Sequence, residues 1–278
     1  KRMEESVADL FRMHWPYKQA KAGRDVRRSA FHRDFGDMGA VFGAPTGWER
    51  PLWFAASEEE KTIRYSMGRQ SWWPAAEREA KAMAEGVGLF ELSPFTKIDV
   101  QGREALALLE MLCANEIDVA EGKAGYTQML NARGGIEADV TVTRLGERHF
   151  RVTSGAVSRQ KDFAWIVRHA ADRGLDAVVS DVTSAEAVLA VMGPRSRALL
   201  QSLTDDDLSD AAFPFSTSRQ IDVGMVNLRA TRVSFVGELG YELYVATEFA
   251  EQLLSTIRAA GAAHGLALCG HYALDGCR

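Results

Sequence analysis

The apolar and polar positions from residue 73 onward follow two periods, one typical of helices and one typical of strands. Helices are expected where apolar residues recur every three to four positions among good helix formers, at 75–85, 103–113, 157–171, 195–203 and 248–263. Strands are expected where short apolar runs or strict alternation lie between turn residues, at 97–100, 126–130, 136–143, 150–153, 187–192, 226–236 and 241–245. Residues 204–219 are polar and predict a loop. Gly86 and Thr247 are the predicted C-cap and N-cap of the helices beside them.

The order of these elements indicates the fold class. Helices and strands are interspersed, and several neighbouring strands are separated only by short turns. This order favours an α+β fold of mixed antiparallel sheets with helices over a doubly wound parallel sheet. No GxGxxG motif follows a strand and no GxxxxGK[ST] motif occurs, so the sequence gives little support to a dinucleotide-binding or P-loop protein.

Residues 1–55 differ from the rest of the chain because they lack sustained periodicity. A basic run at 18–28 is followed by an aromatic-rich stretch at 42–54 that also holds two glycines and two prolines. We interpret residues 1–55 as an extended connector that lies across a surface, with the basic run as a solvated linker. Residues 56–278 are then the folded module, in which we expect two α+β subdomains.

Composition and charge exclude several classes of protein. The 278 residues include 33 Lys and Arg against 38 Asp and Glu, so the formal net charge is −5. This balance argues against nucleic-acid binding, and the absence of an apolar run of about 18 residues argues against a membrane span. Three cysteines without a CxxC pair and six histidines without ligand spacing predict neither a disulfide framework nor a metal site. Reduced thiols fit a bacterial cytoplasm or a mitochondrial matrix.

The first candidate for chemistry is the predicted hairpin in the middle of the chain. If its loop has four residues, Asn131 pairs with Ile136 and Tyr126 pairs with Thr141. Tyr126 then shares one sheet face with Asp139 and Thr141. An aromatic ring, a carboxylate and a hydroxyl on one face can hold a flat polar ring, although polar residues on a hairpin are also normal surface.

The second candidate is the stretch at 233–244. Gly237 and Gly240 allow a tight turn that Glu238 and Glu242 flank. A carboxylate in an enclosed site can accept two N–H bonds from an amidine-like edge, such as that of a pterin. A simple hairpin turn with two solvated glutamates fits the same residues.

Five features in one order resemble the glycine-cleavage T-protein (aminomethyltransferase) superfamily. They are VGLFELS at 87–93, the strand and helix that follow it, LNxxGGIxxD at 130–139, MGPxS at 192–196 and GExGxE at 237–242. The resemblance covers about residues 72–278. It implies a folate-binding fold of mixed antiparallel sheets with helices, with tetrahydrofolate as the cofactor.

The N-terminal stretch is similar to the connector of dimethylglycine and sarcosine dehydrogenases. The similar motifs are MHWP at 13–16, GAVFG at 39–43 and GWERPLWF at 47–54. In that family the connector joins an FAD-dependent amine oxidase to a T-protein-like module, which continues into a last helix and a small C-terminal barrel. The resemblance therefore implies that FAD belongs to an upstream domain and that this chain, ending at Arg278, lacks the small barrel.

The resemblance also assigns roles to five positions. Asp139, in the GGIxxD motif, matches the family's essential aspartate, and Tyr126 and Thr141 match residues that lie against folate. Glu242 matches the glutamate that grips the pterin. Phe235 stands where the family often has a pterin-stacking tyrosine, so stacking is kept and a phenol hydrogen bond is not. The T-protein motif often reads GGIxDD; one aspartate is kept here, as is common in the dehydrogenase branch.

The implied function is tetrahydrofolate-dependent one-carbon transfer. An iminium derived from an N-methyl amine, dimethylglycine or sarcosine, is captured as 5,10-methylene-tetrahydrofolate. Asp139 orients the folate amine and either accepts its proton or stabilises the charge as it develops. The partners are folate, the iminium and an upstream FAD oxidase domain, with no nucleic acid and no membrane. His271 is expected to border the folate site.

Two alternatives stay open. One is a stand-alone aminomethyltransferase of the glycine cleavage system or a folate-dependent demethylase, against which the connector argues. The other is a non-catalytic folate-binding or assembly module, since a fold alone does not establish chemistry. The joint presence of Asp139, Tyr126 and Glu242 argues against it.

Overall fold

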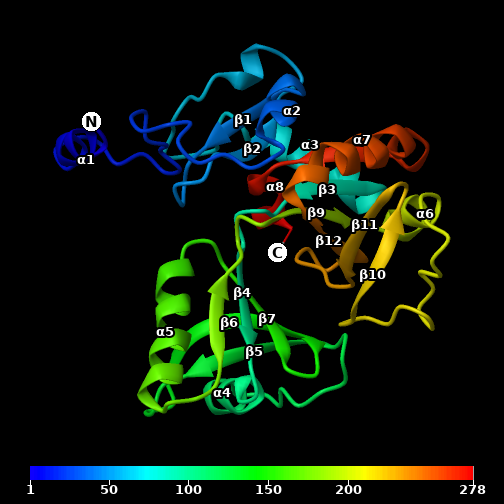
Figure 1. The fold of residues 1–278 in the computed structure, drawn as a ribbon. Coiled ribbons are helices and arrows are strands. Elements are labelled where there is room, and N and C mark those ends of the chain that lie inside the picture. The colour runs from blue at the N-terminus through cyan, green and yellow to red at the C-terminus, as the bar shows by residue number, and fades with distance from the viewer. Residues whose placement is uncertain (278) are drawn as a thin grey trace.

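The computed structural model describes residues 1–277 and is organised around two β-sheets, which lie one above the other in Figure 1. The larger sheet has six strands in the order β10-β11-β12-β9-β3-β13, and only the β13–β3 pair is parallel. Its strands are β3 (Val87–Glu91), β9 (Glu186–Met192), β10 (Ser218–Val223), β11 (Val226–Thr231), β12 (Gly240–Ala246) and β13 (Leu266–Cys269).

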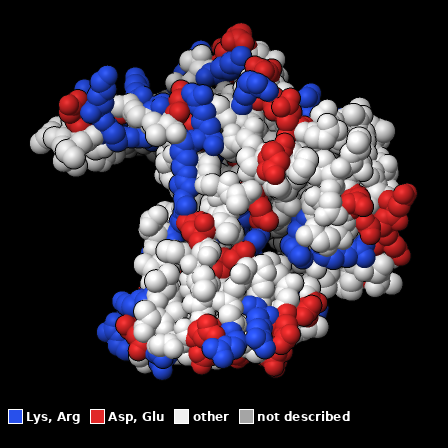
Figure 2. Space-filling model, in the orientation of Figure 1, with Lys and Arg blue, Asp and Glu red and all other residues white. Residues whose placement is uncertain are grey.

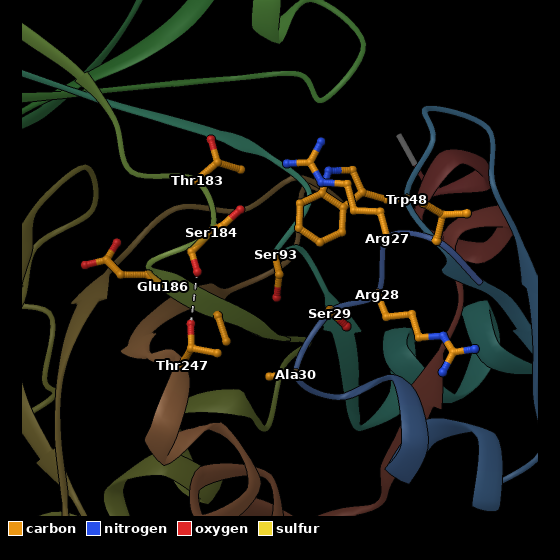
Figure 3. Close-up of a pocket in the computed structure, with 12 residues that line it drawn as sticks. Arg27, Arg28, Ser29, Ala30, Trp48, Ser93, Thr183, Ser184, Glu186 and Thr247 are labelled. Carbon is orange, nitrogen blue, oxygen red and sulfur yellow. Dashed lines mark hydrogen bonds between the residues drawn. The ribbon is translucent and has the colours of Figure 1, made fainter. Parts of the chain in front are cut away.

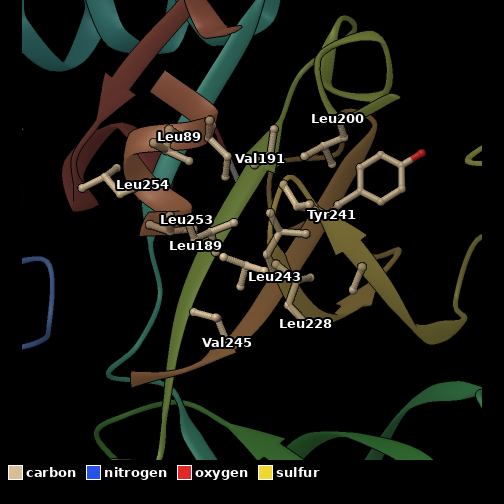
Figure 4. Packing of buried hydrophobic residues seen from close by; sticks show 14 of the residues in the cluster. Leu89, Leu189, Val191, Leu200, Leu228, Tyr241, Leu243, Val245, Leu253 and Leu254 are labelled. Carbon is tan, nitrogen blue, oxygen red and sulfur yellow. The ribbon is translucent and has the colours of Figure 1, made fainter. Parts of the chain in front are cut away.

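The main hydrophobic core lies on one face of this larger sheet. Helices α6 (Ser196–Gln201) and α7 (Ala250–Gly261) cover that face and contribute Leu200 and Leu253 to the core. Figure 4 shows these leucines packed against side chains of β9, β11 and β12. Residues of α8 (His271–Gly276) belong to a second core on the opposite face. The larger sheet is therefore buried on both faces.

The smaller sheet has five antiparallel strands in the order β5-β6-β7-β4-β8. They are β4 (Thr96–Gln101), β5 (Ala124–Leu130), β6 (Ile136–Gly146), β7 (His149–Ser154) and β8 (Val178–Asp181). This sheet is inserted in the chain between β3 and β9, and it has its own core with α4 (Ala105–Leu112) and α5 (Arg159–Asp172). Because these helices cover one face only, the other face of β5, β6 and β7 is free to line a cavity.

The N-terminal segment contains more structure than an extended connector. It forms α1 (Arg2–Asp9), α2 (His32–Asp37), β1 (Ala40–Gly43) and β2 (Arg50–Phe54), and a 3-10 turn η1 (Glu59–Lys61) leads to α3 (Trp73–Glu85). α1 projects from the body in Figure 1, whereas all five residues of β2 are buried. The basic run is also not simply solvated, because Arg24 forms a 2.5 Å ion pair with Glu49, which is 1% exposed. The division of the chain at residue 55 stays a prediction.

Each helix and strand expected after residue 73 has a counterpart in the structure, and Gly86 is the C-cap of α3 as predicted. Two expectations were wrong. The strand expected at 226–236 ends at Thr231, where the Val233 N–H donates to the Thr231 carbonyl and turns the chain out of the sheet. Thr247 does not cap α7; its hydroxyl donates instead to the carbonyls of Ser184 and Ala185, beside β9.

Strands β3, β8, β10 and β13, the short helix α8 and the elements before residue 55 were not expected from the sequence. Arg278, with which the chain ends, lies outside the described residues. Within residues 1–277, no helix has both the length and the apolar character needed to cross a bilayer.

Candidate functional site

A cavity of about 900 Å³ lies between the two sheets. Strands β5, β6 and β7 of the smaller sheet line one side, and β11, β12 and the loop between them line the other. Residues of α8 and of the β1–β2 hairpin complete the wall. Figure 2 shows acidic and basic side chains side by side between the upper and lower halves of the molecule. The volume is in the range of small-molecule sites in proteins.

All five residues predicted for the folate site line this one cavity. They are Tyr126 on β5, Asp139 and Thr141 on β6, Phe235 in the loop before β12, and Glu242 on β12. They come from both sheets and from positions up to 116 apart in the chain, counting from Tyr126 to Glu242. His271, expected at the border, also lines the cavity. The structure thus brings the predicted residues together, while their roles stay predictions.

The strand register explains how the first three residues meet. Tyr126 pairs with Thr141 and Gln128 pairs with Asp139, so the predicted pairing of Tyr126 is confirmed. The predicted pairing of Asn131 with Ile136 was wrong, because a bulge shifts the register between Met129 and Leu130. The bulge lies near the turn, so the pairs farther along the strands keep the predicted face.

Side-chain bonds of Asn131 hold the turn that sets this register. Its Oδ1 accepts the N–H groups of Arg133 at 2.9 Å and Gly135 at 3.0 Å, and its Nδ2 donates to Oε1 of Glu137 at 2.8 Å. Gly134 has a φ of +78°, a conformation that favours glycine. The LNxxGG part of the motif therefore has a local structural role, which fixes where Asp139 lies.

Asp139 is exposed on the cavity wall, where its Oδ1 accepts a 3.3 Å hydrogen bond from Nε2 of Gln128. Sequence reasoning missed Gln128, although its place two positions after Tyr126 on the same face follows from the strand period. The Gln128 amide fixes one carboxylate oxygen. Within residues 1–277, the other oxygen of Asp139 accepts no hydrogen bond, and the residue lines the cavity, where a ligand can reach it.

Two of the five residues have a carboxylate, and that of Glu242 is more enclosed than that of Asp139. It keeps a small exposed surface on the cavity while protein surrounds it elsewhere, and this burial raises its pKa. The Tyr244 hydroxyl donates to its Oε2, and the positive charge of Lys97 acts in the same direction, so both favour the ionised form. The Tyr244 hydroxyl thus holds the Glu242 carboxylate in place, and Glu242 lines the cavity.

Lys97 is a buried cation that the sequence did not single out. Its ammonium donates to the carbonyls of Ser93 at 2.9 Å and Phe95 at 3.2 Å. Burial lowers its pKa to about 8 against the attraction of Glu186, Glu91 and Glu242. Sequence alternation along 97–100 predicted only a strand, and nothing in that pattern showed that the lysine faces carboxylates from the other sheet.

An aromatic wall leads from Phe235 to an arginine. The rings of Phe235 and Phe95 meet edge to face with centroids 5.9 Å apart, and the Arg50 guanidinium carbon lies 5.9 Å from the Phe95 ring centroid. All three residues line the cavity. In the sequence, Arg50 stands out only as part of the GWERPLWF motif, because the pattern of this segment does not show which of its side chains become buried.

The rim of the cavity is polar. Lys161, at the start of α5, donates to the backbone carbonyl of Glu137, and Nε2 of His271 lies 3.4 Å from Oδ2 of Asp275. Within residues 1–277, no cluster of three or more His, Cys, Asp or Glu side chains has the arrangement of a metal site. The three thiols are free.

A second hollow of about 230 Å³ lies where residues 26–30 run along the module (Figure 3). The Arg27 guanidinium stacks on the Trp48 ring at 3.8 Å, and burial together with the charge of Arg159 lowers its pKa. The Thr247 hydroxyl donates to the Ser184 carbonyl across the far side at 3.2 Å. None of the five predicted residues lines this hollow, so it is a seam between the connector and the module.

Comparison with known proteins agrees with the fold. Residues 31–278 match the family model described as GCVT N-terminal domain, so the chain belongs to this family. Over 267 residues it is 34% identical to the mitochondrial dimethylglycine dehydrogenase of Rattus norvegicus, covering 95% of this chain and 31% of that protein. Over 277 residues it is 43% identical to the 4-methylaminobutanoate oxidase (formaldehyde-forming) of Paenarthrobacter nicotinovorans, covering 100% and 33%.

The fold matches a crystal structure of aminomethyltransferase T of the glycine cleavage system from Bartonella henselae. The TM-score is 0.74 at 24% identity, over 91% of this chain and 62% of that one. This likeness confirms the expected fold class. The chain spans about a third of the length of the oxidase and dehydrogenase relatives, so the activities in their names belong to proteins with further parts.

Proposed function

We propose that this chain transfers a one-carbon unit from the iminium of an N-methyl amino acid to tetrahydrofolate, giving 5,10-methylene-tetrahydrofolate and the demethylated amine. The observation that carries the proposal is the convergence of Tyr126, Asp139, Thr141, Phe235 and Glu242 on one cavity between the sheets. The relatives named for dimethylglycine and 4-methylaminobutanoate support an N-methyl amino acid as the source of the carbon.

The residues present fit a reduced folate. A pterin offers a flat ring and an edge with two adjacent N–H donors. Phe235 and Phe95 supply apolar wall for the ring, and the carboxylate oxygens of Glu242 supply acceptors for the N–H groups. The cavity is large enough for the pterin and the amine together.

Asp139 has the catalytic role in this proposal. When bound, tetrahydrofolate would supply two nitrogens for the iminium carbon. The bond from that carbon to the amine nitrogen would break as the second nitrogen bonds, so that the amine leaves, and the first nitrogen must lose its proton. Asp139 accepts this proton, and Gln128 holds its carboxylate at the correct angle. Water that reached the iminium would hydrolyse it to free formaldehyde.

Binding is tested by calorimetric titration of the chain with folinate, a stable reduced folate. Saturable binding that Glu242→Ala abolishes is the expected result. Wild-type protein that shows no saturable binding, or Glu242→Ala that binds as the wild type does, would overturn the folate site.

Transfer is tested with tetrahydrofolate, formaldehyde and N-methylglycine, which form an iminium in solution. We expect the chain to form 5,10-methylene-tetrahydrofolate faster than the uncatalysed background. Asp139→Asn should lower this excess rate about 100-fold while folinate binding persists. Asp205→Asn, an exposed carboxylate outside the cavity, is the matched control. An unchanged rate in Asp139→Asn would favour the non-catalytic folate-binding alternative.

A further inference from the structure

Arg50 lines the cavity, and its guanidinium has no hydrogen-bond acceptor within residues 1–277. The residue is 5% exposed, and its Nε is buried without a hydrogen-bond partner. Within residues 1–277, its side chain forms neither a hydrogen bond nor a close ion pair. Burial lowers its pKa, and only the more distant charges of Glu91 and Asp275 oppose this effect. A buried cation without a hydrogen-bond acceptor or a close counter-ion lowers the stability of the fold unless a ligand supplies them.

A second unused donor lies on the same hairpin. Thr46, in the turn between β1 and β2, lines the same cavity as Arg50, and its buried hydroxyl has no hydrogen-bond partner within residues 1–277. A guanidinium and a hydroxyl are the donors that a carboxylate requires. Two independent buried donors with no protein partner thus point to one anionic ligand group.

The carboxylates near Arg50 do not satisfy it. Glu91 is fully enclosed, its Oε1 accepts the Ser93 N–H at 3.0 Å, and its Oε2 has no partner. Burial raises the pKa of Glu91 and so favours its neutral form. Asp275 is exposed and lies 3.4 Å from His271 instead. Within residues 1–277, Arg50 therefore has no close counter-ion that would compete with a ligand carboxylate.

The position of Arg50 indicates which carboxylate it takes. Ring contacts connect Arg50 to Phe95 and Phe95 to Phe235, the residue proposed to stack on the pterin. Folate carries its glutamate carboxylates at the end of the molecule opposite the pterin. The iminium, in contrast, must lie beside the pterin to react, and in an N-methyl amino acid it carries its own carboxylate.

We propose that Arg50, assisted by Thr46, binds the carboxylate of the N-methyl amino acid substrate and so holds its iminium carbon beside the folate. This inference rests on the proposed function and deepens it, because it names the residues that bind the carboxylate of the amino acid. The same residues belong to the connector, so the connector supplies part of the active site.

The test compares two ligands of similar shape, of which one has a carboxylate and the other a neutral amide in its place. The chain, saturated with folinate, is titrated with dimethylglycine and with N,N-dimethylglycinamide, and binding is followed by saturation-transfer NMR. Wild-type protein should prefer the carboxylate about tenfold or more. Arg50→Gln should remove this preference, and Arg50→Lys should keep part of it. Arg69→Gln is the matched control, because Arg69 lies over the Trp73 ring at 5.2 Å outside the cavity.

The remaining outcomes distinguish a failure of the proposal for Arg50 from a failure of the proposed folate site. Equal preference in wild type and Arg50→Gln, with folinate still bound, would overturn the role of Arg50 and leave the folate site intact. If Arg50→Gln weakens folinate but not 6-methyltetrahydropterin, Arg50 holds a folate carboxylate and the inference is wrong. Absence of folinate binding in the wild type would instead refute the proposed function. Folinate binding by Arg50→Gln shows that this variant is folded.

Discussion

Tyr244 and Glu242 lie two positions apart on β12, and the Tyr244 hydroxyl donates a hydrogen bond to Oε2 of Glu242. Thr153 on β7, in the smaller sheet, interacts with the same hydroxyl and favours its ionised form, which opposes the rise in the Tyr244 pKa caused by burial. One tyrosine therefore connects the carboxylate proposed to bind the pterin with the strand next to β6, which carries Asp139.

Removing this hydroxyl should weaken folate binding. Tyr244→Phe leaves Glu242 buried with one donor fewer, so its pKa should rise further and the ionised form should be harder to keep. A hydrogen bond to a charged group is worth about 1.5–3 kcal/mol, so we expect folinate affinity to fall about tenfold or more. Calorimetric titration at pH 7 measures this loss.

Tyr241→Phe is the control for this variant. Tyr241 is on the same strand with its ring in the main core, where its hydroxyl accepts from Nε of Arg197 at 3.2 Å, away from the cavity. It should lose some stability and no folinate affinity. Equal affinity in Tyr244→Phe and wild type would show that the Tyr244–Glu242 bond does not position the carboxylate for folate.

Phe235 should contribute through its flat ring. Phe235→Leu removes the edge contact with Phe95 and the surface proposed for pterin stacking, whereas Phe235→Tyr keeps both. Stacking of this kind contributes about 0.5–1.5 kcal/mol beyond buried area, so we expect a three- to tenfold loss of folinate affinity in the leucine variant only. Phe249→Leu, half-exposed and outside the cavity, is the control. Similar losses in all three variants would contradict a stacking role.

The sequence predicted the central hairpin well because its signal is local. Alternation from Ile136 and a turn rich in glycine define which side chains share a face, and the pairing of Tyr126 with Thr141 follows from them. The bulge near the turn was not predictable, since an inserted residue changes the ladder without changing the alternation. Glu242 was a candidate from its own stretch of sequence, but only the family resemblance placed it and Phe235 in one site with Asp139, because their distance in sequence from Asp139 hides that they line one cavity.

The contribution of the N-terminal segment was missed for a different reason. Its apolar residues pack one by one against α2, α3 and the larger sheet, so they show no period. Whether Arg50 faces solvent or a cavity depends on α8, which lies more than 200 residues later in the chain and covers the hairpin. Burial of this kind is decided by tertiary contacts and leaves no local pattern.

Glu79 should make stability depend on pH. This residue of α3 is buried, its oxygens accept the N–H groups of Phe54 at 2.6 Å and Gly270 at 2.7 Å, and burial raises its pKa from 4.5 to about 7. Between these values the folded state binds more protons than the unfolded state. Its contribution is therefore fully present below pH 4.5 and is lost as the pH rises through 7, by about 3 kcal/mol.

Urea unfolding at pH 5 and pH 8 measures this dependence. Glu79→Gln should flatten the change in the free energy of unfolding across that window, while Glu85→Gln, exposed at the end of the same helix, should leave it as in the wild type. If wild type and Glu79→Gln lose the same stability between the two pH values, the shift belongs to other groups.

Gly270 should be required for the position of the β1–β2 hairpin. A Cβ at this position would lie 2.3 Å from the Leu52 carbonyl oxygen and 2.5 Å from the Trp53 nitrogen, which are backbone atoms of β2. The backbone at Gly270 is extended, so the effect of a substitution is steric and not a matter of φ. Gly270→Ala must push β2 away from α8, at a cost of about 1–3 kcal/mol.

The same displacement moves Arg50, the first residue of β2, and this gives the variant a second readout. In Gly270→Ala we expect the preference for dimethylglycine over N,N-dimethylglycinamide to fall together with the melting temperature, while folinate, held by residues of the two sheets, still binds. Gly276→Ala is the control, because a Cβ there meets no atom within 4 Å. A destabilised Gly270→Ala that keeps the full carboxylate preference would mean that the hairpin can shift without moving the guanidinium, which the close packing of β2 against α8 argues against.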